Sequence, residues 1–300
     1  MRTTWTGVGT ALVTPFTKSG DLDEQGVRRL GRRQIDAGIH FLVPCGTTGE
    51  SPTLSDAERI RVVEILVDEA NGEVPVLAGA GSYNTREVIQ LGDEMRRAGA
   101  SGLLSVAPYY NKPSQEGLYL HFRAIAESTP LPIIVYNIAG RTGVNVETPT
   151  LARLAELPNI VGVKEASGNI AQMADVCRTL PADFLVLSGD DAVTLPLMAI
   201  GGRGVISVAS NEIPGEMVQM VEAAERGDFE AARAVHHRIM PLMQVNFVEG
   251  NPGPVKAAMA AMGLLEEVFR LPMCPPKSES KAKIVKVLKE LDLLKHAFAE

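Results

Sequence analysis

Cysteine is scarce in this sequence, which contains only Cys45, Cys177 and Cys274. Their number is odd and they are far apart along the chain, so they indicate neither a disulfide framework nor a zinc cluster. The five histidines lack the spacing of metal-ligand motifs such as His-Glu-x-x-His. We therefore predict no metal site, and we expect the reducing cytoplasm to be the compartment.

Long apolar runs, blocks of like charge and low-complexity stretches are also missing. No segment is apolar over the length of a bilayer, and the first residues lack the apolar core of a signal peptide, so we expect no association with a membrane. The formal net charge of −7 argues against a nucleic-acid partner. Hydrophobic residues make up 45% and charged residues 22% of the 300 positions, which is typical of a soluble globular protein with a sizeable core.

What the chain does contain is a recurring series of short apolar runs, whose starts lie 20 to 35 residues apart. The runs of strand length are 8–13, 39–43, 74–78, 102–106, 132–136, 160–164, 184–187 and 204–208. The helix-like segments between them are 24–37, 56–71, 86–98, 115–127, 149–156, 170–179 and 192–200. Strands that alternate with helices indicate a parallel sheet.

Eight such units by about residue 225 indicate closure into a (β/α)8 TIM barrel. An open, doubly wound sheet is the alternative, but it normally has a glycine-rich phosphate turn after its first strand, and here Thr14-Pro15-Phe16 follow. The remaining segments are read as helices without strands between them: 212–226, 229–247, 253–262 and 280–297. We therefore expect a barrel over 1–226 and a C-terminal helical domain over 227–300.

Lys164 stands at the end of the sixth predicted strand, an unusual place for a residue whose ammonium group is strongly hydrated. If the side chain lies in a dry pocket, loss of hydration lowers its pKa and leaves a nucleophilic amine near neutral pH. An ordinary surface lysine in an ion pair is the alternative. The active sites of TIM barrels lie at the carboxyl ends of the strands, so the position of Lys164 favours catalysis.

Polar residues gather after the other strands as well. The Gly-Thr-Thr-Gly turn at 46–49 offers backbone N–H groups and two hydroxyls that suit a carboxylate or phosphate, although an ordinary strand-to-helix turn is equally consistent with it. Tyr109, Tyr110 and Tyr136 can pass protons to and from an amine, or can simply lie at the edge of the core. Arg141 can bind a substrate carboxylate, or can form a surface salt bridge.

These motifs together form a recognisable set. They are 46–51 (Gly-Thr-Thr-Gly-Glu-Ser), 108–113 (Pro-Tyr-Tyr-Asn-Lys-Pro), 136–137 (Tyr-Asn), 141–143 (Arg-Thr-Gly), 164–166 (Lys-Glu-Ala) and 188–191 (Ser-Gly-Asp-Asp). The set resembles the dihydrodipicolinate synthase family, in register from about residue 7 to residue 276, including the segment 204–208 and the tail segment 252–256. Related pyruvate-dependent lyases share the lysine, the tyrosine before it and the Gly-Thr-Thr-Gly turn, but the run 109–117 together with 141–143 favours the synthase.

The resemblance implies an activity and a role for each matching residue. Pyruvate would form an imine with Lys164 and then react with L-aspartate 4-semialdehyde, with no cofactor beyond the lysine. Tyr136, Thr47 and Tyr110 would pass protons, and Tyr110 would come from a neighbouring subunit. The residues that would bind substrate are Thr48, Arg141, Gly189 and Ile206. The family is usually a homotetramer built as a dimer of dimers, which we expect here.

The resemblance also implies an effector site, at Ser51, Asp56, Arg59, Tyr83, Glu87 and Tyr109. In lysine-inhibited members, histidines often stand at the positions of Asp56 and Arg59, and an asparagine stands at that of Tyr83. These replacements change charge and volume, so we predict weak or absent feedback by lysine. Two other functions remain open: a pyruvate-dependent aldolase or lyase for a 2-keto-3-deoxy sugar acid or N-acetylneuraminate, and a non-catalytic barrel that binds a 2-keto acid.

Overall fold

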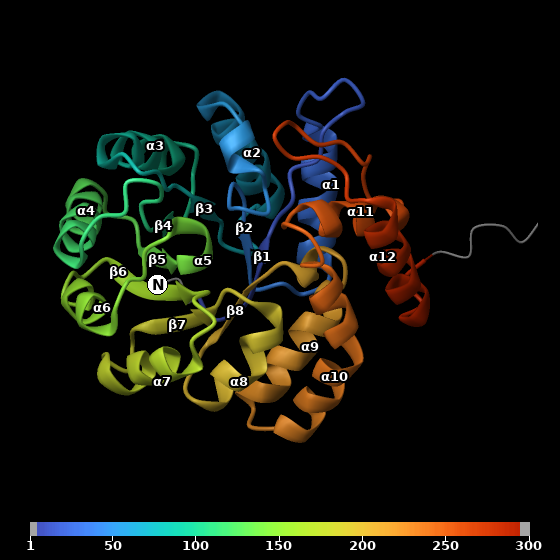
Figure 1. Ribbon diagram of the computed structural model, residues 1–300. Coiled ribbons are helices and arrows are strands. Elements are labelled where there is room, and N and C mark those ends of the chain that lie inside the picture. The colour runs from blue at the N-terminus through green and yellow to red at the C-terminus, as the bar shows by residue number, and fades with distance from the viewer. Residues whose placement is uncertain (1–4, 295–300) are drawn as a thin grey trace, which may run out of the picture.

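The computed structural model describes residues 5–294, and in them eight parallel strands form one sheet that curls into a barrel (Figure 1). The strands are β1 (Gly7–Ala11), β2 (Phe41–Val43), β3 (Leu77–Gly79), β4 (Gly102–Val106), β5 (Ile133–Asn137), β6 (Ile160–Glu165), β7 (Leu185–Ser188) and β8 (Gly204–Ser207). Their order is β2-β1-β8-β7-β6-β5-β4-β3, and a parallel bridge between Leu42 and Val76 closes the ring. The predicted (β/α)8 barrel is confirmed.

Helices follow the strands and surround the barrel (Figure 1). They are α1 (Glu24–Asp36), α2 (Asp56–Ala70), α3 (Thr85–Arg97), α4 (Gln115–Ser128), α5 (Ala139–Thr142), α6 (Thr148–Ala155), α7 (Ile170–Thr179), α8 (Thr194–Ala199) and α9 (Pro214–Glu225). Local signals set their starts: Ser55 and Glu58 form a capping box at α2, and Ser114 accepts a hydrogen bond from the N–H of Gly117 at α4. The short helix α5 was not predicted.

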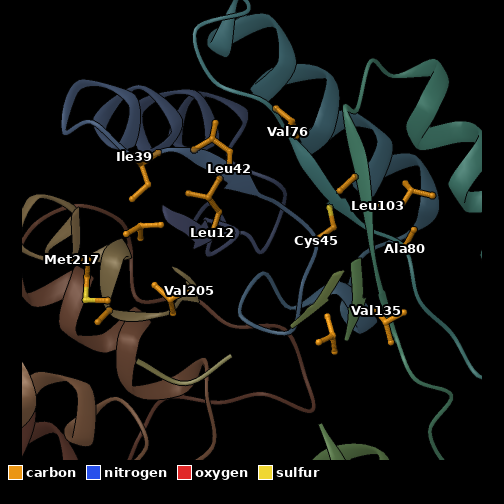
Figure 2. Close-up of a cluster of buried hydrophobic side chains, with 14 of the residues drawn as sticks. Leu12, Ile39, Leu42, Cys45, Val76, Ala80, Leu103, Val135, Val205 and Met217 are labelled. Atoms are coloured by element: carbon orange, nitrogen blue, oxygen red, sulfur yellow. The ribbon is translucent and has the colours of Figure 1, made fainter. Parts of the chain in front are cut away.

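Side chains alternate between the two faces of the strands, as strand geometry requires. Leu103 and Val135 point outward into the layer between the strands and the helices, where Figure 2 draws them with Leu42 and Val205. The residues that directly follow Leu103 and Val135 on their strands are Leu104 and Tyr136, and both belong to a separate cluster inside the barrel. The inward positions of the strands therefore determine which side chains reach the mouth of the barrel.

Three further helices complete the described chain: α10 (Phe229–Val245), α11 (Gly253–Ala261) and α12 (Ser278–Glu290). In Figure 1, α11 lies beside α1, and Val255 and Met259 of α11 pack with Leu30 of α1. The predicted last helix, 280–297, was too long. It ends at Glu290 because the chain turns there through Asp292 at φ 55°, and positions 295–297 lie outside the described residues.

Candidate active site

Lys164 lies near the carboxyl end of β6 and faces the interior of the barrel, since the preceding Val163 packs outward. Its side chain is 6% exposed, and its Nζ lies 4.1 Å from the centroid of the Tyr136 ring. Burial lowers the pKa of Lys164 to about 7, while the charge of Asp191 acts to raise it and that of Arg141 to lower it. A neutral, nucleophilic amine is therefore available near neutral pH.

Tyr136 is the partner of Lys164 in the pairing of β5 with β6. Its side chain is buried and forms a hydrogen bond with the side chain of Thr47. Burial raises the pKa of Tyr136, although the hydrogen bond with Thr47 and the charge of Arg141 act to lower it. The phenol thus keeps its proton at neutral pH, and it can exchange that proton within a chain of groups beside the amine.

The Gly-Thr-Thr-Gly turn at 46–49 connects β2 with a short 3-10 helix, η1 (Ser51–Thr53). Residues with positive φ stand on either side of the turn, Cys45 at 58° and Glu50 at 53°. Thr14 Oγ1 donates a hydrogen bond of 2.7 Å to the carbonyl of Gly49, which ties the turn to the segment after β1. The turn is therefore held in a defined shape at the mouth of the barrel, where its N–H groups and hydroxyls can receive an anion.

Arg141 lies on α5, directly after the strand that carries Tyr136. Its Nη2 donates a hydrogen bond of 3.1 Å to the carbonyl of Asn251, and Asn251 Nδ2 donates one of 3.1 Å to Thr48 Oγ1. Asn251, which the sequence analysis missed, thus joins the arginine to the turn. The available signal was its place directly before the tail segment 252–256, which is part of the family pattern.

A cavity of about 310 Å³ lies over these groups. Thr47, Tyr136, Arg141 and Asn251 line it, so the structure brings together four polar side chains from distant parts of the chain. Lys164 does not line the cavity itself. Tyr136 does line it, and the ring of Tyr136 contacts the amine of Lys164. The cavity is large enough for small keto acids, and its largely apolar wall carries a few hydrogen-bond donors.

Gly189 and Ile206, two of the predicted substrate-binding residues, lie close to this centre. Gly189 follows β7, and a Cβ there would lie 2.6 Å from Ala166 Cβ and 3.0 Å from Lys164 Cε. Only glycine leaves this space for the lysine side chain. Ile206 on β8 is fully buried and belongs to the same interior cluster as Tyr136, but it does not line the cavity.

Tyr110 is a predicted catalytic residue that the single chain leaves exposed and outside the lining of the cavity. Its side chain is 88% exposed, and its φ of 71° turns the backbone sharply at this position. The preceding Tyr109 lines the cavity instead, with its ring 5.3 Å from that of Tyr83 in an edge-on contact. In the single chain Tyr110 is therefore not part of the cavity wall.

The six residues of the predicted effector site divide into two groups. Those lining the cavity are Ser51, Arg59 and Tyr109. Those exposed around it are Asp56, Tyr83 and Glu87. The guanidinium of Arg59 donates two hydrogen bonds to the carbonyl of Ser51, at 3.1 and 2.7 Å, and one to Asp56 at 3.3 Å. Arg59 is thus held within its own chain at one end of the cavity.

In the described range 5–294, no group of three or more His, Cys, Asp or Glu side chains could hold a metal ion. No helix in the same range is long and apolar enough to cross a membrane. Among the polar groups at or beside the cavity are the amine of Lys164, the hydroxyls of Thr47 and Tyr136, and the guanidinium of Arg141.

A TIM barrel with a buried, neutral lysine amine beside tyrosine and threonine hydroxyls, at the carboxyl ends of its strands, belongs to the class of lysine-dependent aldolases and lyases. Within that class, the chain is a member of the dihydrodipicolinate synthetase family, whose model matches residues 4–291. The family expected from the motifs is thereby confirmed.

Relatives and solved structures agree with this assignment. The chain is 53% identical over 292 residues to a 4-hydroxy-tetrahydrodipicolinate synthase of Koribacter versatilis, a match that covers 97% of each chain. A crystal structure of dihydrodipicolinate synthase from Thermotoga maritima superimposes with a TM-score of 0.95 at 45% identity, covering 96% of this chain and 97% of that one. A structure described as a monomeric dihydrodipicolinate synthase variant also has a TM-score of 0.95 at 45% identity, with coverage of 96% and 99%.

Proposed function

We propose that the protein is a 4-hydroxy-tetrahydrodipicolinate synthase, which condenses pyruvate with L-aspartate 4-semialdehyde in diaminopimelate and lysine biosynthesis. The observation that carries this function is the buried amine of Lys164 against the ring of Tyr136, next to a cavity that also holds Arg141. The names of the similar proteins support the same activity. The enzyme is a lyase that uses a lysine Schiff base, and it needs no cofactor beyond that lysine.

The reaction begins when the neutral Nζ of Lys164 attacks the ketone carbon of pyruvate. The carbonyl oxygen leaves as water, and an imine joins the lysine to the substrate. Loss of a methyl proton gives an enamine, whose carbon attacks the aldehyde of the semialdehyde. The amine of that second substrate then attacks the imine carbon, which closes the ring and releases Lys164 as the free amine.

Each proton transfer in this sequence needs a group that can both give and accept a proton. Tyr136 is placed for this role, because its ring contacts Lys164 and its hydroxyl bonds to Thr47. The turn carrying Thr47 and Thr48 would bind the carboxylate of pyruvate. Arg141 would bind the carboxylate of the semialdehyde, with Gly189 and Ile206 shaping the pocket around the bound substrates.

The third member of the proton relay, Tyr110, would enter the site from a second subunit. The exposure of its side chain in the single chain supports this arrangement. The enzyme would then be at least a dimer, and we propose the tetramer, a dimer of dimers, that the family usually forms. The similar structure described as a monomeric variant makes a measurement of mass in solution necessary.

Two measurements on the purified protein test the proposed function. Borohydride reduction in the presence of pyruvate should add one reduced pyruvate to Lys164, detected by mass spectrometry of the peptide. Addition of aspartate semialdehyde should then yield the ring product. A protein that traps pyruvate but forms no ring product would be an aldolase for another substrate, and one that traps no pyruvate would be a binding protein.

Feedback by lysine would be weak or absent. The cavity end that carries Ser51 and Tyr109 is occupied by the guanidinium of Arg59, which is positively charged like the effector's amine and is held by its own chain. Repulsion between the two cations disfavours binding of lysine there, and so does the volume that the Arg59 side chain occupies. Strong inhibition at low lysine concentration in a steady-state assay would contradict this proposal.

Two further expectations concern the whole chain. The division into a barrel over 1–226 and a helical domain over 227–300 is supported by the position of α10, α11 and α12 after the last strand. A cytoplasmic location is supported by the three cysteines, all of which are free thiols.

A further inference from the structure

The segment that leads into α11 contacts the 46–49 turn, and α11 itself contacts Glu50, the residue after the turn. Asn251 Nδ2 donates a hydrogen bond of 3.1 Å to Thr48 Oγ1. Five residues further on, Lys256 Nζ forms an ion pair with Glu50 Oε1 at 2.5 Å. Because the contacts join residues more than 200 positions apart, the shape of the turn depends on the C-terminal part of the chain.

The ion pair is completely enclosed, with both side chains at 0% exposure. Lys256 Nζ also donates a hydrogen bond of 2.7 Å to the carbonyl of Val268 and lies 4.4 Å from the centroid of the Phe16 ring. Enclosed charges with several partners hold a single geometry, because any displacement leaves a charge without compensation. Glu50, which lines the cavity and has a positive φ, is therefore fixed at the end of the turn.

We propose that Asn251 and Lys256 are positioning residues for pyruvate, which hold the turn in the shape that receives the substrate carboxylate. In this inference Asn251 acts through Thr48, and Lys256 acts through Glu50. This inference rests on the proposed function, in which the turn binds pyruvate. It gives the C-terminal extension a part in substrate binding as well as in packing.

Two variants separate positioning from folding. Asn251→Ala removes the hydrogen bond to Thr48 but keeps the backbone carbonyl that accepts from Arg141. The double variant E50Q/K256M replaces both charges together, so that no buried charge is left unpaired. Asn159→Ala is the matched control, since it removes hydrogen bonds of 2.9 Å to two carbonyls at the end of β6 opposite to Lys164.

The measurement is the pyruvate concentration that gives half the maximal rate of borohydride trapping, together with KM for each substrate. Asn251→Ala and E50Q/K256M should each raise the pyruvate values about tenfold, as expected for a misplaced binding group, and leave KM for the semialdehyde nearly unchanged. The control should lower the melting temperature without this shift.

Wild-type-like pyruvate values in Asn251→Ala would overturn the inference, and so would an equal rise in the control or in the KM for both substrates. If the double variant does not fold, Asn251→Ala alone decides. Failure of the wild-type protein to trap pyruvate would instead refute the proposed function, and the inference with it.

Discussion

Lys164 illustrates how much of the chemistry depends on the surroundings of one side chain. Burial is the main cause that lowers its pKa to about 7, and the ring of Tyr136 lies 4.1 Å away on the neighbouring strand. The same lysine at the surface would remain protonated at neutral pH, with a pKa near 10.5. The reactivity of the residue therefore comes from its position in the barrel.

The pKa of Lys164 predicts how the first chemical step responds to pH. Only the neutral amine attacks pyruvate, so the trapping rate at low pyruvate should rise with pH, by about tenfold per unit below pH 7, and level off above it. Arg141→Met removes a positive charge that lowers this pKa, so its profile should move toward higher pH. A wild-type rate that continues to rise to pH 10 would contradict the prediction.

The site could be predicted from the sequence where a residue stands at or shortly after the carboxyl end of a strand. Lys164, Tyr136 and Thr47 all stand at such positions, so the rule that barrel active sites lie at the carboxyl ends of strands was enough to group them. Asn251 could not be found in this way, because its contact with Thr48 joins residues 203 positions apart and leaves no local pattern. The expectation that Tyr110 acts from a neighbouring subunit likewise came only from the family resemblance.

At the scale of elements, the strands were predictable because each is a short, buried apolar run, but some of their ends moved, by up to three residues. The helix α5 was missed because its four residues are too few to show a periodic pattern. That helix carries Arg141, so a short unpredicted element determines where the guanidinium lies relative to the cavity.

The turn after β7 allows a test of how closely this turn approaches Lys164 on β6. Gly189→Ala would place a methyl group 2.6 Å from Ala166 Cβ and 3.0 Å from Lys164 Cε, so the lysine or the turn must shift. We expect the rate of pyruvate trapping to fall by about tenfold or more. Gly215→Ala is a suitable control, because a Cβ there meets nothing within 4 Å and alanine favours the helix. Equal trapping rates in the two variants would show that the space beside Lys164 is not required.

At the scale of the whole molecule, the segment between α11 and α12 is tied back to the barrel by Arg270. Its guanidinium donates to both carboxylate oxygens of Glu58 on α2, at 2.9 and 2.6 Å, and to the carbonyl of Thr53 at 3.1 Å. Pro272 and Met273, which follow Arg270, line the cavity. The same tie therefore stabilises the fold and places one wall of the site.

This tie should make the stability of the protein sensitive to acid. Arg270 lowers the pKa of Glu58 from 4.5 to about 2, so the pair stabilises the folded state above pH 4.5, and this contribution is lost as the pH falls toward 2. Because the pair is partly exposed, we expect Glu58→Gln to reduce the free energy of unfolding by only about 1 kcal/mol at pH 7. Denaturant titrations should find the difference from wild type shrinking between pH 4.5 and pH 2, and a constant difference would contradict the assignment.

At the scale of the assembly, the site can be tested through Tyr110, whose side chain is 88% exposed in the single chain. If Tyr110 acts in the neighbouring subunit, Lys164→Arg and Tyr110→Phe subunits should restore each other when they are produced together. In a mixed dimer, the subunit with Tyr110→Phe keeps its lysine and receives an intact tyrosine from its partner. Random pairing makes half of the dimers mixed, each with one intact site, so about a quarter of the wild-type activity should return.

The two variants mixed after separate purification, without subunit exchange, serve as the control. Activity no higher than in that control would mean that Tyr110 does not act across subunits, and the relay would then have to be built within one chain.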